Sequence, residues 1–172
     1  MHQKSRNQRS FTGLVEKILF RKEICKPLRC IPDESWLRIF MVRLTDEIKE
    51  SLADTKIVFF ATVSRDKVPN AVPIGAFKIL DDETLLISDQ YFNKTLANIK
   101  ENPNVAISYW GEKGGYQIKG TVTLHTGDEI FRQDVAWMKE LRPHLVPKSA
   151  VVMKITGVYI LKPGPDAGKK IL

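Results

Sequence analysis

The segment from Gly115 to Thr126 alternates regularly between apolar and polar side chains. Successive side chains of a β-strand point to opposite faces, so this pattern predicts one long strand with a core face and a polar face. The apolar set is Tyr116, Ile118, Val122 and Leu124, and the polar set is Gln117, Lys119, Thr121, Thr123 and His125. A strand of this kind favours an antiparallel sheet that covers a core on one side.

Further strands are predicted from short apolar runs that turn residues separate. Lys56–Val63 is almost continuously apolar, and we expect it to be buried on both faces. A turn at 64–67 joins it to a second strand over about 70–80. The other strands are expected at 84–88, 105–110 and 150–161. Six strands with mostly hairpin links predict a mainly β fold, a six-stranded antiparallel barrel with peripheral α-helices.

Helices are predicted between some of these strands. Thr45 is a good N-cap for a short helix that follows Met41, and a second helix is expected from Asn93 to about Asn102. A third covers Asp128–Leu141 before Pro143 ends it. Its apolar residues at helical spacing are Ile130, Phe131, Val135, Met138 and Leu141.

The junction between the strand at 84–88 and the helix after it has the composition of an anion site. Polar side chains follow the strand from Ser88 and Asp89, and the helix begins at Asn93-Lys94-Thr95. The first backbone N–H groups of a helix lack intrahelical partners and attract anions, while Lys adds a charge and Thr a hydroxyl. A phosphate would fit there, although Asn93 acting only as a helix cap explains the same residues.

The positive charge of the chain is concentrated at its N-terminus. The net charge is +7, but residues 1–40 hold 9 Lys/Arg against 4 Asp/Glu, and residues 41–172 hold 18 against 16. A nucleic-acid reader would carry a basic stripe with interleaved aromatic residues on its folded part. The nearly neutral domain argues against that class of function.

The chain is expected to divide into three parts. Residues 1–40 lack a sustained period and are predicted to be a weakly structured extension, or not native at all if Met41 is the natural start. Residues 41–165 form the barrel domain, and 166–172 a basic C-terminal tail. Two cysteines, no secretory signal and no apolar run long enough to span a bilayer predict a cytoplasmic protein. A basic leader of the transit type is the alternative for the first residues.

Four blocks in order resemble the pyridoxamine 5'-phosphate oxidase-like split-barrel flavoproteins, particularly the small FMN-binding members. The resemblance covers about Thr45 to Leu161. The blocks are Phe60-Ala61-Thr62-Val63, then Pro69-Asn70-Ala71-Val72-Pro73-Ile74-Gly75, then Asn93-Lys94-Thr95 with Asn98, Asn102-Pro103 and Val105, and finally Gly115-Tyr116-Gln117-Ile118-Lys119-Gly120.

This resemblance implies a split barrel and a homodimer with FMN at its interface. The residues that it assigns to the phosphate are Asn93, Lys94 and Thr95, and those along the ribityl chain are Ser88 and Asp89. Backbone groups of Pro73, Ile74, Gly75 and Ala76 would face the flavin ring, and Gln117 would reach the phosphate or the ring edge. No catalytic side chain and no metal ligand are assigned, because the redox chemistry would belong to the cofactor.

The function that the resemblance implies is an FMN-dependent oxidoreductase or an electron-transfer protein with an unidentified substrate or partner. The C-terminus, Lys162-Pro163-Gly164-Pro165 and a basic tail, departs from the Arg-rich terminus of full-length pyridoxamine phosphate oxidases, so oxidation of pyridoxamine phosphate is not expected. Two alternatives remain open at this point. The same barrel could bind the deazaflavin F420 or haem, or the chain could be a small-barrel nucleic-acid module.

Overall fold

The computed structural model of the chain describes residues 42–111 and 114–172, and these residues contain three helices and seven strands. The extension expected at 1–40 lies outside the described residues. In chain order the elements are α3 (Asp46–Ala53), β1 (Val58–Val63), β2 (Pro69–Ile74), β3 (Phe77–Ile79), β4 (Thr84–Asp89), α4 (Lys94–Glu101), β5 (Asn104–Gly111), β6 (Gly114–His125), α5 (Glu129–Leu141) and β7 (Ser149–Ile160).

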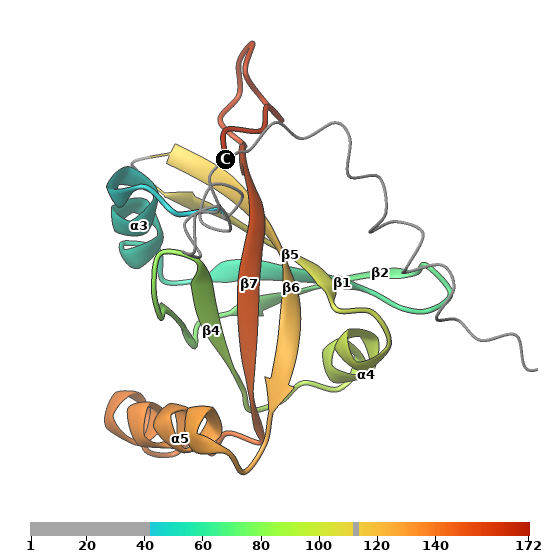
Figure 1. Cartoon of the computed structure of the whole chain (residues 1–172), viewed down its shortest axis with the longest axis vertical. Helices are drawn as coiled ribbons and strands as arrows, with labels where there is room; N and C mark the ends of the chain where they lie inside the picture. The colour runs from blue at the N-terminus through green and yellow to red at the C-terminus, as the bar shows by residue number, and fades with distance from the viewer. Residues whose placement is uncertain (1–41, 112–113) are drawn as a thin grey trace, which may run out of the picture. The chain divides into compact units, whose positions relative to one another are not determined.

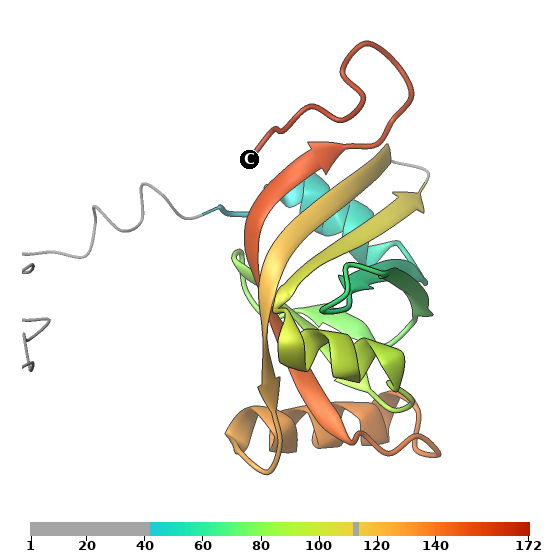
Figure 2. The same ribbon diagram turned by 90° about the vertical axis from the view of Figure 1, so that its right-hand side faces the viewer.

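The seven strands form one antiparallel sheet in the order β2-β1-β5-β6-β7-β4-β3. β2 and β3 lie at opposite edges of this order, yet only Gly75 and Ala76 join them along the chain. A link of two residues brings the two edges together, so the sheet curls, as Figures 1 and 2 show. The architecture is the mainly β split barrel that the sequence predicts.

The segment predicted as one strand over 70–80 consists of two strands, which makes seven strands instead of six. β2 pairs with β1, whereas β3 pairs with β4. The chain leaves one edge of the sheet at Ile74 and joins the other at Phe77. The backbone carbonyl of Ala76 already accepts from the N–H of Ser88 over 2.9 Å, which starts the new pairing. The break therefore closes the barrel.

β1 alternates between buried and exposed side chains, so the expectation that both of its faces are buried is wrong. Val58 and Phe60 are fully buried in the core, whereas Phe59 is 55% exposed. Phe60 stacks on Phe92 of the loop after β4, with ring centroids 6.0 Å apart. The side of the sheet that carries Phe59 is left uncovered by the described helices, and Ile57 just before the strand is 54% exposed.

The helices close different parts of the barrel. Thr45 caps α3 as predicted, accepting from the N–H of Ile48, and Leu52 of the same helix is fully buried. α5 lies across one end of the long strands β6 and β7 instead of along a sheet face (Figure 1). Of the described residues, no helix has the length and apolar character to cross a membrane.

Because α5 meets the barrel only at one end, most of its apolar residues are not fully buried. Met138 and Asp134 are the fully buried residues of this helix, whereas Leu141 is 49% exposed. A carboxylate occupies one of the two innermost positions.

The C-terminal residues fold back along the second half of β7. The backbone N–H of Ile171 donates to the carbonyl of Val158 over 2.8 Å, and the carbonyl of Lys169 accepts from Ile160 over 3.1 Å. Leu172 packs against the core. The segment predicted as a basic tail, 166–172, thus extends the hydrogen bonding of β7.

Candidate functional site

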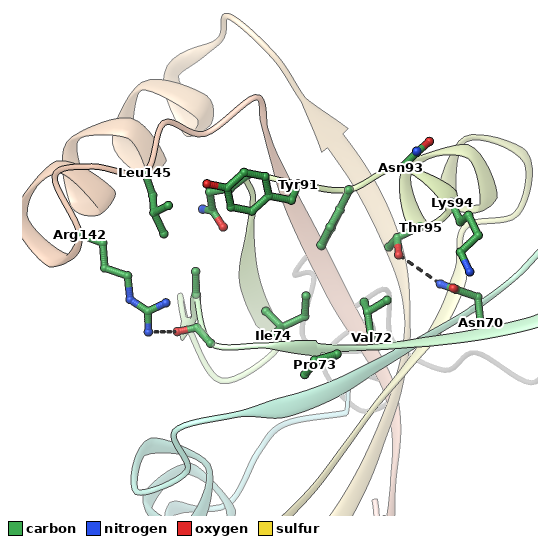
Figure 3. Close-up of a pocket in the computed structure, with 14 residues that line it drawn as sticks. Asn70, Val72, Pro73, Ile74, Tyr91, Asn93, Lys94, Thr95, Arg142 and Leu145 are labelled. Carbon is green, nitrogen blue, oxygen red and sulfur yellow. Dashed lines mark hydrogen bonds between the residues drawn. The ribbon is translucent and has the colours of Figure 1, made fainter.

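A cavity of about 370 Å³ lies where β2, the loop after β4 and the segment after α5 meet (Figure 3). Its volume is within the usual range of small-molecule sites, about 300–1,000 Å³. The lining residues are Asn70, Val72, Pro73, Ile74, Gly75, Ala76, Gln90, Tyr91, Phe92, Asn93, Lys94, Thr95, Arg142 and Leu145.

β2 supplies an apolar side of this cavity. Figure 3 shows Val72 and Ile74 pointing from β2 toward Tyr91, with the ring of Pro73 on the other side of the strand. Gly75 follows, and a methyl group at this position would lie 3.2 Å from a guanidinium nitrogen of Arg142. The absence of a side chain at Gly75 therefore keeps this part of the cavity open. An apolar side without projecting polar groups suits a flat aromatic ligand.

One end of the cavity is positively charged. Lys94 begins α4, its side chain is exposed, and it makes no ion pair or side-chain hydrogen bond with any residue that the structure describes. The N–H groups of the first helical turn lie beside it and have no intrahelical acceptor. A free ammonium group and the positive end of a helix dipole both favour a bound anion.

Thr95 is held in place by a cluster of side chains from two strands and α4. Its Oγ1 accepts from Nδ2 of Asn70 over 3.1 Å, and the same amide donates to Oγ1 of Thr62 over 3.1 Å. Asn98 donates to Thr62 from the other side over 3.0 Å. Because Thr95 accepts from Asn70, its hydroxyl hydrogen remains available to a ligand.

Asn93 does not act as the side-chain cap of α4, contrary to the alternative that the sequence left open. It is the N-cap residue, but its side chain makes no capping hydrogen bond. Its backbone carbonyl accepts from the N–H of Ala97 over 3.0 Å, the first bond of the helix. The Asn93 side chain therefore accepts no hydrogen bond from the N–H groups of the first turn of α4.

Arg142 brings a second cation to the opposite end of the cavity (Figure 3). It follows the last residue of α5, and its guanidinium donates a long hydrogen bond, 3.4 Å, to the carbonyl of Gly75. Nothing in the sequence indicates this contact, because Arg142 and Gly75 are 67 positions apart. The cavity therefore has cationic groups at both ends and apolar surface between them.

Ser88 and Asp89, expected along the cofactor chain, do not line the cavity. Both are buried at the end of β4. The carboxylate of Asp89 accepts from the backbone N–H of Phe92 over 2.7 Å and from the hydroxyl of Ser149 over 2.9 Å. Asp89 therefore lies behind the loop after β4 and holds it in place, while residues of that loop line the cavity.

Ser88 links the cavity to the buried carboxylate of α5. Its hydroxyl donates to Oδ2 of Asp134 over 2.8 Å and accepts from Nε2 of Gln90 over 2.7 Å. Burial raises the pKa of Asp134 above its ordinary value, against the opposing effects of the Ser88 hydrogen bond and the charge of Lys78. Gln90 itself lines the cavity.

Gln117 is also absent from this cavity. It lies on β6, where its amide donates a long hydrogen bond, 3.4 Å, to the hydroxyl of Ser108. Its neighbours across the sheet are Ser108 on β5 and Tyr159 on β7. Of the ten residues that the resemblance assigns, seven meet at the cavity, namely Pro73, Ile74, Gly75, Ala76, Asn93, Lys94 and Thr95.

Several lining residues were missed by sequence reasoning. Asn70 and Val72 belong to a block that carries the family resemblance, so their position beside Pro73 was a usable signal. Gln90 and Tyr91 directly follow Asp89, a predicted site residue, and this adjacency is a weaker signal. Arg142 and Leu145 come from the segment after α5, and only the three-dimensional arrangement brings them to the cavity.

Comparison with protein families places most of the chain in one of them. The family model of pyridoxamine 5'-phosphate oxidase matches residues 44–162. An uncharacterized protein of Methanocaldococcus jannaschii is 48% identical over 134 residues, which are 76% of this chain and 89% of that protein.

Solved structures with the same fold are more distant in sequence. HupZ of Group A Streptococcus has a TM-score of 0.64 at 23% identity, over 73% of this chain and 99% of its own. An FMN-binding protein of Syntrophomonas wolfei has a TM-score of 0.59 at 19% identity, over 88% of this chain and 99% of its own.

The names of two further structures of this fold mention other ligands, F420 and heme. An F420 reductase has a TM-score of 0.53 at 19% identity, over 67% of this chain and 98% of its own. The heme storage protein HutZ of Vibrio cholerae has a TM-score of 0.55 at 18% identity, over 69% of this chain and 94% of its own. These likenesses establish the fold, and the family model with the M. jannaschii relative establishes the family. The chain belongs to the pyridoxamine 5'-phosphate oxidase family.

Proposed function

We propose that this protein binds FMN in the cavity and acts as an FMN-dependent oxidoreductase or electron-transfer protein. The observation that carries the proposal is the combination of Lys94 and the free start of α4 at one end with the apolar surface of β2 beside it. FMN has the same division, since a phosphate dianion is joined through a polar chain to a flat aromatic ring.

The residues present fit this cofactor. Lys94 provides a point charge for the phosphate, and Thr95 provides a hydroxyl whose acceptor side is already occupied by Asn70. Val72 and Ile74 offer apolar contact to a ring, and Gly75 leaves space for it. Asn93 contributes backbone next to the phosphate position.

FMN, when bound, supplies transfer of one or two electrons with the accompanying protons. The chain's own part is to hold the phosphate with Lys94 and Thr95, to cover the ring with apolar side chains, and to limit access of water. Arg142 adds positive charge at the far end, where a ligand with an anionic group would be favoured.

The alternative ligands are less well supported by the cavity. Haem needs an axial iron ligand, and the lining residues include no His, Cys or Met, so Tyr91 is the sole candidate among them. F420 shares a flat ring and a phosphate with FMN, so the two ligands are distinguished by measuring the binding of each. Nucleic-acid binding is not favoured, because residues 41–172 are nearly neutral.

The test is a binding series with two lysine variants. The purified full chain is titrated with FMN, riboflavin, F420 and haem, and its visible spectrum is recorded as isolated. We expect FMN to bind, and Lys94→Ala to reduce FMN affinity about ten- to a hundredfold by loss of a charge-assisted contact. Riboflavin affinity should be unchanged in this variant, because riboflavin has no phosphate.

Lys100→Ala is the matched control, since Lys100 is an exposed lysine in the last turn of the same helix. It should bind FMN as the unaltered protein does. Tighter binding of F420 or haem than of FMN would contradict the proposal, and equal losses in the two lysine variants would contradict the phosphate assignment.

We also propose that the functional unit is a homodimer. One row of neighbours across the sheet contains Pro73 on β2, Phe59 on β1, Ser108 on β5, Gln117 on β6 and Tyr159 on β7. Pro73 lines the cavity, and Phe59 beside it is half-exposed. A second copy that covers this apolar face would bury Phe59 and could bring its own Gln117 toward the cavity.

The dimer is tested by sedimentation of Phe59→Lys, with Val68→Lys as a control. Val68 is another exposed apolar residue, 60% exposed, in the turn before β2. We expect Phe59→Lys to yield monomers and Val68→Lys to leave the dimer intact, because burial of a charge in an interface is costly. A monomeric unaltered protein at micromolar concentration would contradict the dimer.

A further inference from the structure

The carboxylate of Asp134 has a position that packing alone does not explain. It is completely buried on α5, and its Oδ1 has no hydrogen-bond partner among the described residues. Burying a carboxylate in place of an apolar side chain is unfavourable unless strong contacts compensate for it. Its Oδ2 accepts a hydrogen bond from the hydroxyl of Ser88.

The hydrogen bonds that start from Asp134 have a fixed direction. An ionised carboxylate can only accept, so the hydroxyl of Ser88 donates its single hydrogen to Asp134, over 2.8 Å. The oxygen of Ser88 is then an acceptor, and the amide group that lies 2.7 Å from it must be Nε2 of Gln90 and not its oxygen. Asp134 thereby determines the orientation of the Gln90 amide.

Gln90 is the point at which this chain of hydrogen bonds reaches the cavity. The residues after β4 that line the cavity run along the chain from Gln90 to Thr95, so Gln90 is the first of them and Lys94 and Thr95 are the last. With Nε2 bound to Ser88, Oε1 is the amide atom left for a ligand. It has no hydrogen-bond partner within residues 42–111 and 114–172.

We propose that Gln90 determines ligand specificity by presenting Oε1 to a ring N–H of the cofactor, with Asp134 as a positioning residue that acts through Ser88. The inference rests on the proposed binding of FMN. The oxidised isoalloxazine ring has a single N–H donor, at N3, and its other polar ring atoms are acceptors. An acceptor at the cavity lining that Ser88 holds in place therefore selects the N3–H edge of the ring and disfavours a ring that lacks this hydrogen.

The test compares the dissociation constants of FMN and of 3-methyl-FMN, measured by calorimetry on the full chain. The unaltered protein should prefer FMN. Gln90→Met keeps the length of the side chain and removes the acceptor, so this preference should fall about three- to tenfold, the factor expected for one hydrogen bond. Gln133→Met, on the exposed side of α5, is the matched control and should leave the preference unchanged.

The positioning role of Asp134 is tested by two substitutions. Asp134→Asn keeps an acceptor oxygen for Ser88 and should retain the preference for FMN, whereas Asp134→Leu removes the acceptor and should lose as much preference as Gln90→Met does. Circular dichroism establishes that each variant folds, and Gln90→Leu replaces Gln90→Met if the latter does not.

The outcomes separate this inference from the proposed function. If the unaltered protein does not bind FMN, the proposed function fails. If FMN binds and the preference over 3-methyl-FMN is the same in Gln90→Met, the role of Gln90 is refuted while FMN binding stands. If Asp134→Leu keeps the preference that Gln90→Met loses, Gln90 contacts the ligand but Asp134 does not position it.

Discussion

Nδ2 of Asn70 lies 3.1 Å from Oγ1 of Thr95, so a residue of β2 holds the side chain that follows the start of α4. The same amide bonds Thr62 of β1. The amide of Asn70 thus ties β2 and α4, which both line the cavity, to the neighbouring strand β1.

Asn70→Ala should lower both stability and FMN affinity. Two hydrogen bonds are lost, which corresponds to about 1–3 kcal/mol of unfolding free energy, and the hydroxyl of Thr95 becomes free to rotate away from the phosphate. Urea unfolding and FMN titration measure the two effects. Asn104→Ala is the control: its amide donates to Asn102 at the surface, away from the cavity, and the variant should leave FMN affinity unchanged. An unchanged FMN affinity in Asn70→Ala would show that Thr95 needs no fixing by Asn70.

Ser149→Ala should destabilise the loop after β4. The hydroxyl of Ser149 donates to the fully buried carboxylate of Asp89, and its removal leaves one carboxylate oxygen unsatisfied at a cost of about 1–3 kcal/mol. Urea unfolding should show this loss, and hydrogen exchange of the Phe92 amide should become faster. Thr126→Ala, at an exposed threonine after β6, should have no such effect.

Gly120→Ala should be strongly destabilising. β6 has an irregularity in its pairing with β7 between Lys119 and Gly120, and a methyl group at Gly120 would collide with the backbone carbonyl oxygen of Lys154. Backbone cannot move aside as a side chain can, so we expect a loss of several kcal/mol or no folded protein. Gly111→Ala is the control, since its nearest neighbour would be 3.4 Å away, and it should fold. Equal stability of the two variants would contradict the prediction.

The stability of the protein should depend on the ionisation of Asp134. Burial raises its pKa, and the charge of Asp89 adds to this, while Ser88 and Lys78 oppose it. A group whose pKa is raised on folding contributes stability below its unfolded pKa, about 3.9, and that contribution is lost as pH rises through the folded pKa. Asp134→Asn cannot ionise and should avoid this loss.

The prediction for Asp134 is checked by urea unfolding of both proteins between pH 3.5 and pH 7. The difference in unfolding free energy should shift in favour of Asp134→Asn as the pH rises. A difference that is constant over this range would mean that the pKa of Asp134 is the same in the folded and unfolded chains.

Much of the fold could be predicted because strands have a short-range signature. The alternation in 115–126 and the apolar runs at 56–63, 84–88, 105–110 and 150–161 correspond to strands of the sheet. The break at Gly75 and Ala76 could not be predicted, because pairing with two different edges is a long-range property. The exposure of Phe59 was missed for a similar reason, since an apolar residue on an uncovered face has the same local pattern as a buried one.

The cavity was predicted in part. The block at 93–95 and the block at 73–76 meet there, which follows from the resemblance and from the physics of a helix start. Ser88 and Asp89 are polar residues next to the site, and sequence alone does not separate a lining residue from one that lies behind the lining. The burial of Asp134 could not be predicted, because a single carboxylate within an amphipathic helix usually lies on its solvent face.

The cavity lies at the two-residue link between β2 and β3, so a ligand there would bind a part of the chain that exists only in the folded barrel. Gly75 and Ala76 join the two edges of the sheet and also line the cavity, so a ligand there would contact the chain where the barrel closes. A ligand that binds only the folded chain adds about 2.7 kcal/mol to the unfolding free energy at a hundred times its dissociation constant. The melting temperature of this protein should therefore rise with cofactor concentration, and protein prepared in cofactor-poor cells should be the more readily degraded.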